Sequence, residues 1–357
     1  MYTKAHIIRI RIKALSGVLA LVLLAGCMKP DVYTTDPHTN FEALWKILDE
    51  HYCFFEYKQV DWDEVYRKYS VLVSDTMNQY VLFDFLGNML AELKDGHTNL
   101  ISSFNIARYW LWYEDYPPNF NSELHKLYLG TDYLIAGGMK YRRLSGNQIG
   151  YMYYGSFSSG VGENNLDYIF DYFKECKGLI IDVRENGGGS LTYSDRIASR
   201  FLKEKITVGY IKHKTGPGHT DFSELYPIEL SPSKRVRWLR PVVVLTNRHS
   251  YSATNDFVNK MKLLPHVTIM GDRTGGGSGL PFNSELPNGW SVRFSASPML
   301  DVNKQDTEHG IEPDIKVSLT SDDLLKGKDT LIEEAIKVLM ERRGNNTNDQ
   351  TVVIDFK

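Results

Sequence analysis

Apolar residues recur at helical spacing along the first part of the chain. Between residues 38 and 93 they return every three or four positions in three successive runs, a pattern typical of amphipathic helices. Each run opens on a capping sequence, because Thr39, Asp61 and Thr76 each stand three residues before a Glu or Gln. The pattern predicts a helical subdomain over residues 38–100, with its apolar stripes forming a core.

The pattern changes at residue 148. Short, continuously apolar runs at 179–183, 242–245 and 267–270 predict buried strands. Helical spacing lies before, between and after these runs, at 166–174, 194–202, 253–264 and 330–342. Alternating strands and helices predict an α/β (α+β) core over residues 148–344.

Two stretches show no clear period. Residues 101–147 are aromatic and irregular, and they form either a short β-segment or the wall of a groove. Residues 345–357 are polar and predict a frayed tail.

The beginning of the chain has the pattern of a secretion signal. Residues 1–13 are basic, and the apolar run over 14–25 is too short to span a bilayer as a mature helix. The run ends in Leu-Ala-Gly-Cys at Cys27, which resembles the lipobox of bacterial lipoproteins. The resemblance implies a signal peptide over 1–26, a lipid on Cys27 and a tether over 27–37. The alternative is an ordinary secretion signal with a chance cysteine.

Composition excludes several classes of function. A formal net charge of −3 gives no basic footprint for nucleic acid. Besides Cys27, only Cys53 and Cys176 remain, which are too few for a disulfide scaffold. The ten histidines show no zinc-binding spacing. We therefore expect neither a metal nor another cofactor.

Residues 242–257, reading VVVLTNRHSYSATNDF, place serines between a strand and a helix. The first N–H groups of a helix are unpaired and attract an anion, which is what a serine nucleophile needs beside it. Ser250 or Ser252 could equally be an N-cap, and this stretch alone favours the N-cap. His97 lies in the turn after Asp95 and Gly96, and it has a functional role only if the fold brings another residue into contact with it.

A strand–glycine loop–helix unit lies at residues 179–202. Its glycines lack the spacings of phosphate-binding loops. Glycines in such a loop allow backbone N–H groups to approach a ligand oxygen closely.

Four separated stretches occur in one order: DGHT at 95–98, IIDVRENGGG at 180–189, VVVLTNRHSYSATNDF at 242–257 and GIEPDI at 310–315. Together they resemble the tail-specific or C-terminal processing peptidases and their relatives, the tricorn core protease and the interphotoreceptor retinoid-binding protein. The resemblance covers residues 41–319. It implies a crotonase-like ββα superhelix with an N-terminal helical subdomain, and a serine-type peptidase.

The resemblance also assigns residues. The middle serine of the third motif is the family's nucleophile, which here is Ser252. The processing branch takes a lysine base from the loop at 271–277, where this chain has none. The tricorn branch instead implies His97 as the base and Glu308 as its acidic partner. Asp306 and Glu312 remain rivals of Glu308, because the spacing varies.

The same resemblance implies that Gly187, Gly188 and the Ala253 N–H bind the oxyanion. Arg184 and Asp314 are expected to hold loops together. A PDZ-type module, which the processing branch carries between the first two motifs, has too little room in about 50 residues. Recognition of substrate C-termini through such a module is therefore in doubt.

These patterns favour a lipid-anchored serine endopeptidase of the bacterial cell envelope, on the periplasmic face or the outer-membrane surface. Its partners are then a peptide or protein substrate and, through the anchor, the membrane. The alternative is a catalytically weak or inactive binding protein on the same fold, for an apolar ligand or peptide. A peripheral subunit that recognises other envelope proteins is a weaker possibility. Substrate identity and oligomeric state are not encoded in any motif.

Overall fold

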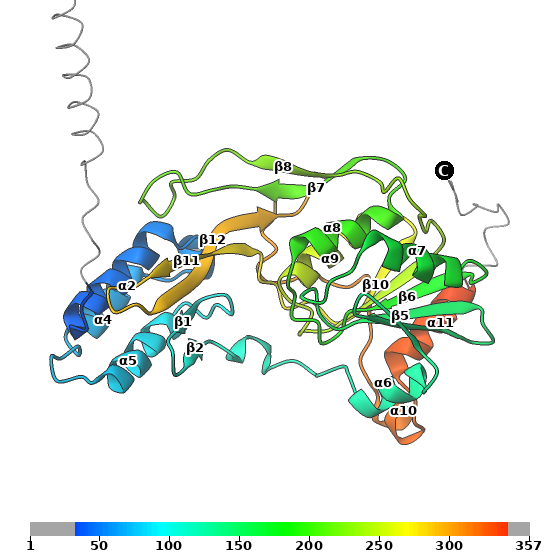
Figure 1. Cartoon of the computed structure of the whole chain (residues 1–357), viewed down its shortest axis with the longest axis horizontal. Coiled ribbons are helices and arrows are strands. Elements are labelled where there is room, and N and C mark those ends of the chain that lie inside the picture. The colour runs from blue at the N-terminus through cyan, green and yellow to red at the C-terminus, as the bar shows by residue number, and fades with distance from the viewer. Residues whose placement is uncertain (1–32, 342–357) are drawn as a thin grey trace, which may run out of the picture.

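The computed structural model describes residues 33–341. The proposed signal peptide, Cys27, most of the tether and the tail at 345–357 lie outside these residues. Within residues 33–341 the strands form two sheets, one of six and one of seven strands. Figure 1 shows a body of helices and strands from the two halves of the chain beside a larger α/β body. No helix in the described part is long and apolar enough to cross a membrane.

The smaller body begins with the predicted helical segment. Its helices are α2 Pro37–His51, α3 Phe55–Lys58, α4 Trp62–Ser70 and α5 Gln79–Ala91. Three of them match the three amphipathic runs, whereas the one-turn α3 has no period long enough to be recognised.

The helix caps differ in part from those predicted. The Asp61 carboxylate accepts the Glu64 N–H at 2.8 Å, as its position suggested. Asp36, not Thr39, caps α2, because its carboxylate accepts the Thr39 N–H at 2.7 Å. Asn78, not Thr76, caps α5. The capping sequences therefore predicted where these helices begin to within a few residues.

The six-stranded sheet is antiparallel and packs against α2 and α5. Its long strand β12 pairs with β1, β11 and β7, and β7 pairs with β8. The strands are β1 Asn99–Ile101, β2 Ile106–Arg108, β7 Ile206–Ile211, β8 Tyr226–Leu230, β11 Gly279–Glu285 and β12 Ser291–Leu300. The smaller body is thus built from segments of both halves of the chain.

The seven-stranded sheet has the order β13-β10-β9-β6-β5-β4-β3 and forms the centre of the α/β body. Neighbours from β5 to β13 are parallel, and β4 and β3 add antiparallel strands at one edge. The strands are β3 Leu134–Ala136, β4 Met139–Leu144, β5 Ile149–Tyr154, β6 Gly178–Asp182, β9 Val242–Thr246, β10 Val267–Gly271 and β13 Ile315–Lys316. The predicted α/β class is confirmed.

Helices cover both faces of this sheet (Figure 1). Because side chains alternate along a strand, Leu179 and Ile181 of β6 pack into one core and Ile180 into the other. The first core lies under α7 Glu163–Tyr172, α8 Leu191–Ala198 and α9 Ala253–Lys262, and the second under α6 Ser122–Leu129 and α11 Thr330–Glu341. Burial on both faces explains why β6, β9 and β10 read as continuous apolar runs.

Residues 101–147 are more regular than the sequence indicated. They contain β2, the 3₁₀ turn η1 Leu111–Tyr113, α6, β3 and β4, and a short helix α10 Ser321–Leu325 lies near α6 (Figure 1). The β-segment left open by the sequence is present as β3 and β4, whereas α6 was not predicted. These elements did not stand out because β3 has only three residues and β4 loses its alternation at Arg142 and Arg143.

Candidate active site

Ser252 lies where β9 turns into α9, directly before the first helical residue. Its backbone has φ 60° and ψ −121°, a conformation that a residue with a side chain rarely adopts. Strained residues persist where the surrounding structure fixes them, and they cluster at functional sites. The Ser252 hydroxyl makes no capping hydrogen bond within the described residues. The simple N-cap interpretation is therefore wrong for Ser252.

Ser250 has a structural role. Its hydroxyl donates to the Val183 carbonyl at 2.8 Å and accepts the Asn247 N–H at 3.2 Å, and its side chain is fully buried. These bonds join the turn after β9 to the loop after β6. The structure thus separates the two serines that the sequence left open.

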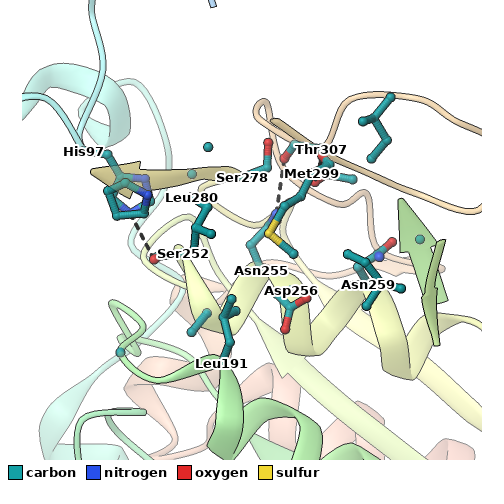
Figure 2. A pocket seen from close by; sticks show the side chains of 18 of the residues that line it. His97, Leu191, Ser252, Asn255, Asp256, Asn259, Ser278, Leu280, Met299 and Thr307 are labelled. Carbon is teal, nitrogen blue, oxygen red and sulfur yellow. Dashed lines mark hydrogen bonds between the residues drawn. The ribbon is translucent and has the colours of Figure 1, made fainter. Parts of the chain in front are cut away.

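His97 reaches Ser252 from the smaller body. Its Nε2 lies 2.9 Å from the Ser252 Oγ, although 155 residues separate the two in the sequence (Figure 2). The Asp95 carboxylate accepts the His97 backbone N–H at 2.8 Å and fixes the turn between α5 and β1. The imidazole also contacts the Tyr251 ring, with centroids 4.9 Å apart. The fold therefore supplies the partner that His97 needed.

The environment of His97 favours its neutral form. Burial lowers the pKa of His97 to about 4; the Asp95 charge opposes this, while Arg293 and Lys58 add to it. A neutral imidazole can accept the proton of a serine hydroxyl. The other ring nitrogen, Nδ1, is buried and has no hydrogen-bond partner among residues 33–341.

Glu308 is not hydrogen-bonded to His97. Its Oε2 accepts the Ser278 N–H at 2.8 Å, and its Oε1 lies 3.0 Å from the Lys58 Nζ. Burial raises the pKa of Glu308 to about 7, against the opposing effect of Lys58. The structure brings Ser252 and His97 together and leaves Glu308 bound to a lysine.

The two rival carboxylates have other contacts. Asp306 accepts the Glu308 N–H at 2.8 Å and the Ser278 hydroxyl at 3.1 Å, so it braces the loop that carries Glu308. Glu312 is largely exposed and lies 3.4 Å from the Arg273 guanidinium. Neither carboxylate is hydrogen-bonded to His97, because the His97 Nδ1 has no partner among the described residues.

The glycine loop after β6 lies against Ser252. Gly188 has φ +97°, and a Cβ at this position would lie 2.7 Å from the Ser252 Cβ and 2.9 Å from the Ala253 nitrogen. The Gly188 N–H donates to the Asn186 side chain at 3.0 Å. The Ala253 N–H is in the first turn of α9 and has no acceptor within the helix. Gly187 is exposed, with open space around it.

A buried ion pair holds this loop in place. Arg184 and its two carboxylate partners are fully buried; its guanidinium binds Asp182 at 2.7 Å and Asp329 at 2.9 Å. It also donates to the Asn119 carbonyl at 3.1 Å. Asp314 similarly ties a loop to β10, because it accepts the Ile269 N–H at 2.8 Å. Both residues have the structural role expected of them.

The lysines near Ser252 are engaged elsewhere. The Lys260 ammonium lies 2.6 Å from Asp195, and the Lys262 ammonium lies 2.9 Å from Asp314. A serine–lysine pair is therefore not formed by either residue of α9.

A cavity of about 300 Å³ opens beside Ser252 and His97 (Figure 2). Several apolar side chains line it, and Asn255, Asp256 and Arg293 add polar groups. The apolar residues are Leu191, Val208, Ile228, Leu280 and Met299. No group of His, Cys, Asp and Glu suited to a metal occurs among residues 33–341. The arrangement offers a serine with an adjacent base, a helix N-terminus and room for a side chain of a ligand.

Sequence reasoning missed Lys58, Asp95 and Ser278. Lys58 lies in the one-turn α3, outside every motif, and Ser278 bonds to Glu308 through its backbone. Only Asp95 carried a signal, since it belongs to the first motif, DGHT.

Known proteins resemble this chain in two segments. Residues 148–317 match peptidase family S41, and residues 33–91 match the tricorn protease C1 domain. A crystal structure of a candidate peptidase from Parabacteroides merdae ATCC 43184 is 70% identical, with a TM-score of 0.84, and the match covers 88% of this chain and 100% of that one.

More distant relatives match over about half of the chain. Tricorn protease from Thermoplasma acidophilum is 29% identical over 188 residues, which are 52% of this chain and 16% of tricorn. Carboxy-terminal processing protease CtpB from Bacillus subtilis is 25% identical over 201 residues, or 56% of this chain and 40% of CtpB. The chain thus spans less than half the length of these two relatives. The family matches and the near-complete agreement with the Parabacteroides structure show that the chain belongs to peptidase family S41, a family of serine-type peptidases.

Proposed function

We propose that the protein is a serine endopeptidase of the bacterial cell envelope that hydrolyses peptide bonds. Ser252 is its nucleophile, His97 its base and Glu308 its acidic partner. The observation that carries the proposal is the 2.9 Å contact between the Ser252 Oγ and the His97 Nε2, made at a helix N-terminus by a serine with strained backbone. A hydroxyl needs such a base before it can attack a carbonyl carbon.

The reaction follows from this geometry. As the Ser252 Oγ attacks the peptide carbonyl, its proton moves to the His97 Nε2, and His97 then protonates the leaving amine. A water molecule then attacks the acyl group while His97 accepts its proton, and the acyl group is released from Ser252. We assign the oxyanion to the Ala253 N–H, which lies beside Ser252 at the start of α9, and to the Gly187–Gly188 loop. Gly188 packs against Ser252, although its N–H is bonded to the Asn186 side chain in this structure.

The acidic partner acts on the imidazolium that forms during the reaction. Asp95 brings negative charge to the buried surroundings of His97, and Glu308 is linked to Asp95 through Lys58. The His97 Nδ1 has no partner among residues 33–341, so a direct hydrogen bond to Glu308 requires one of the two side chains to move.

Labelling with a fluorophosphonate, followed by mapping of the modified residue, tests the proposal. We expect Ser252 to be modified in the wild-type protein and Ser252→Ala to lose the label, because among residues 33–341 no other hydroxyl is paired with His97. Ser158→Ala is the matched control, since Ser158 is exposed near the glycine loop and should not affect labelling. Label retained by Ser252→Ala would overturn the assignment of the nucleophile.

The same experiment separates the alternative function. The bond between Glu308 and Lys58 favours a catalytically weak binding protein, because the acid does not support the base in this conformation. A folded wild-type protein that takes no label, cleaves no peptide library and binds an apolar ligand or peptide tightly would favour that alternative.

We further propose that a lipid on Cys27 anchors the protein to the envelope. The motif Leu-Ala-Gly-Cys after a basic and an apolar segment supports this. In a bacterial host, Cys27→Ser should lose incorporation of labelled palmitate and move from the membrane fraction to the soluble fraction. Cys176→Ser, which changes a buried cysteine of the core, should remain lipidated. Equal membrane association of wild type and Cys27→Ser would contradict the anchor.

A further inference from the structure

Lys58 joins the helical segment to the surroundings of the catalytic base. Its ammonium lies 3.0 Å from the Glu308 Oε1 and 3.8 Å from the Asp95 Oδ2, and it donates to the Lys94 carbonyl at 3.1 Å. The Lys58 side chain is 11% exposed, and those of Asp95 and Glu308 are 0% and 5% exposed. One lysine thus stands between two buried carboxylates.

The remaining contacts of these carboxylates come from neutral groups. The Tyr52 hydroxyl and the Ser295 hydroxyl donate to Asp95, at 2.8 and 3.0 Å, and the Ser278 N–H donates to Glu308. Two buried carboxylates near one another repel, and without a cation one of them takes up a proton. Lys58 therefore sets the charge of this cluster.

The cluster is connected directly to His97. The Asp95 Oδ1 accepts the His97 N–H. The Asp95 Oδ2 accepts the Tyr52 hydroxyl and faces the Lys58 ammonium. The position of the His97 turn and the placement of Lys58 are consequently linked through one carboxylate.

We propose that Lys58 is a positioning residue for the catalytic base: by binding Asp95 and Glu308 together, it fixes the turn of His97 and keeps the base able to accept the Ser252 proton. This rests on the proposed function of Ser252 and His97. It gives α3 a part in the reaction that no motif of the chain indicated.

The electrostatics agree with this role. The Lys58 charge helps to lower the pKa of His97 and opposes the rise in the pKa of Glu308. Without Lys58, His97 and Glu308 hold their protons to higher pH. His97 is then unable to act as a base over a wider range of pH. The ionisable groups around Lys58 are Tyr52, Cys53, Tyr57, Asp95, His97, Asp306, Glu308 and His309, with Asp61, Glu64, Lys68, Glu92 and Lys94 lining the neighbouring cavity.

The test is the pH dependence of fluorophosphonate labelling at Ser252 in purified full-length variants. In Lys58→Met we expect the midpoint of the acid limb to move upward by about one pH unit, which slows labelling below the midpoint about tenfold. Lys58→Arg keeps the charge and should keep the wild-type midpoint. Lys68→Met removes an exposed lysine that pairs with Glu92 at the same cavity and should change nothing.

A double variant guards against loss of folding. Lys58→Met/Glu308→Gln removes the buried carboxylate that has lost its cation, which protects the fold. Because Glu308 is already uncharged in the acid limb without Lys58, the double variant should have the same midpoint as Lys58→Met. A Lys58→Met protein that labels more slowly at every pH with an unchanged midpoint would overturn the inference, as would a double variant with the wild-type midpoint. Absence of label on wild-type Ser252 would instead overturn the proposed function.

Discussion

At the scale of single residues, the site depends on where two side chains are held. Ser252 has a backbone conformation that turns its hydroxyl away from α9 and towards His97. His97 is buried against Tyr251 and fixed through its backbone by Asp95. Ser252 and His97 are thus placed by their main chains, and their side chains need little freedom to meet.

The low pKa of His97 predicts activity in mild acid. Its pKa of about 4 lies below the ordinary value of 6.5, so the folded protein binds fewer protons than the unfolded chain between these two pH values. Stability therefore rises with pH in this window, and the base becomes active as pH rises through about 4. We expect the labelling rate of Ser252 to be near its plateau by about pH 5.5.

Rates of labelling measured from about pH 4 to pH 8 check this, with far-UV circular dichroism as the control for folding. An acid limb centred near the ordinary histidine value would contradict the inferred effect of burial.

Sequence motifs identified those site residues that lie in a recognisable local pattern. Ser252 and His97 could be recognised because each lies in a short local pattern, a strand-to-helix turn and an Asp-Gly turn. The contact of Glu308 with Lys58 could not, because 250 positions separate them and any buried carboxylate could take the same lysine. The choice between Ser250 and Ser252 also required the fold, since both stand in the same turn.

At the scale of elements, parallel strands bring the loops together. β6 and β9 are neighbours in the sheet, so the loops that follow them, one with glycines and one with Ser252, end at the same edge. The continuous apolar runs of these strands made them easy to recognise. The β7–β8 pair did not stand out, because its strands are only partly buried and mix polar with apolar residues.

The glycine loop gives a prediction for neighbouring positions. Gly188→Ala places a Cβ 2.7 Å from the Ser252 Cβ at a residue with φ +97°, so the loop or the nucleophile has to move. We expect labelling to fall about a hundredfold, the usual effect of a disturbed oxyanion site. Gly160→Ala is the control, because Gly160 is exposed and its added Cβ would meet only the Tyr193 side chain, at 3.4 Å. Equal labelling of the two variants would show that the close approach is unimportant.

At the scale of the whole molecule, distant parts of the chain complete the site. His97 comes from the smaller body and Ser252 from the α/β body, and the strands β11 and β12 return the chain from one to the other (Figure 1). The apolar pattern predicted both bodies but not that late strands would join the early helices. Pairing between β1 and β12 brings together residues almost two hundred positions apart, which no local period can reveal.

The Arg184–Asp329 pair predicts a large effect on stability. Asp329→Asn keeps an oxygen that can accept the Leu331 N–H at the start of α11, but it removes a buried charge from Arg184. We expect a loss of about 3 kcal/mol in the free energy of unfolding. Lys337→Met, which breaks an exposed pair in the same helix, should cost less than about 0.5 kcal/mol.

Urea unfolding of both variants measures the difference. A similar small loss of unfolding free energy in both variants would mean that Asp182 alone is enough to balance the buried charge of Arg184.

The position of Asp329 also bears on when the peptidase becomes active during synthesis. Ser252, His97 and Glu308 all precede it in the sequence, so a growing chain carries them before α11 exists. The glycine loop, however, is anchored through Arg184 by a residue 145 positions further on. We therefore expect chains that end before residue 329 to contain Ser252, His97 and Glu308 without a shaped site. An incomplete chain would then be inactive, and labelling of Ser252 would begin only after α11 has docked.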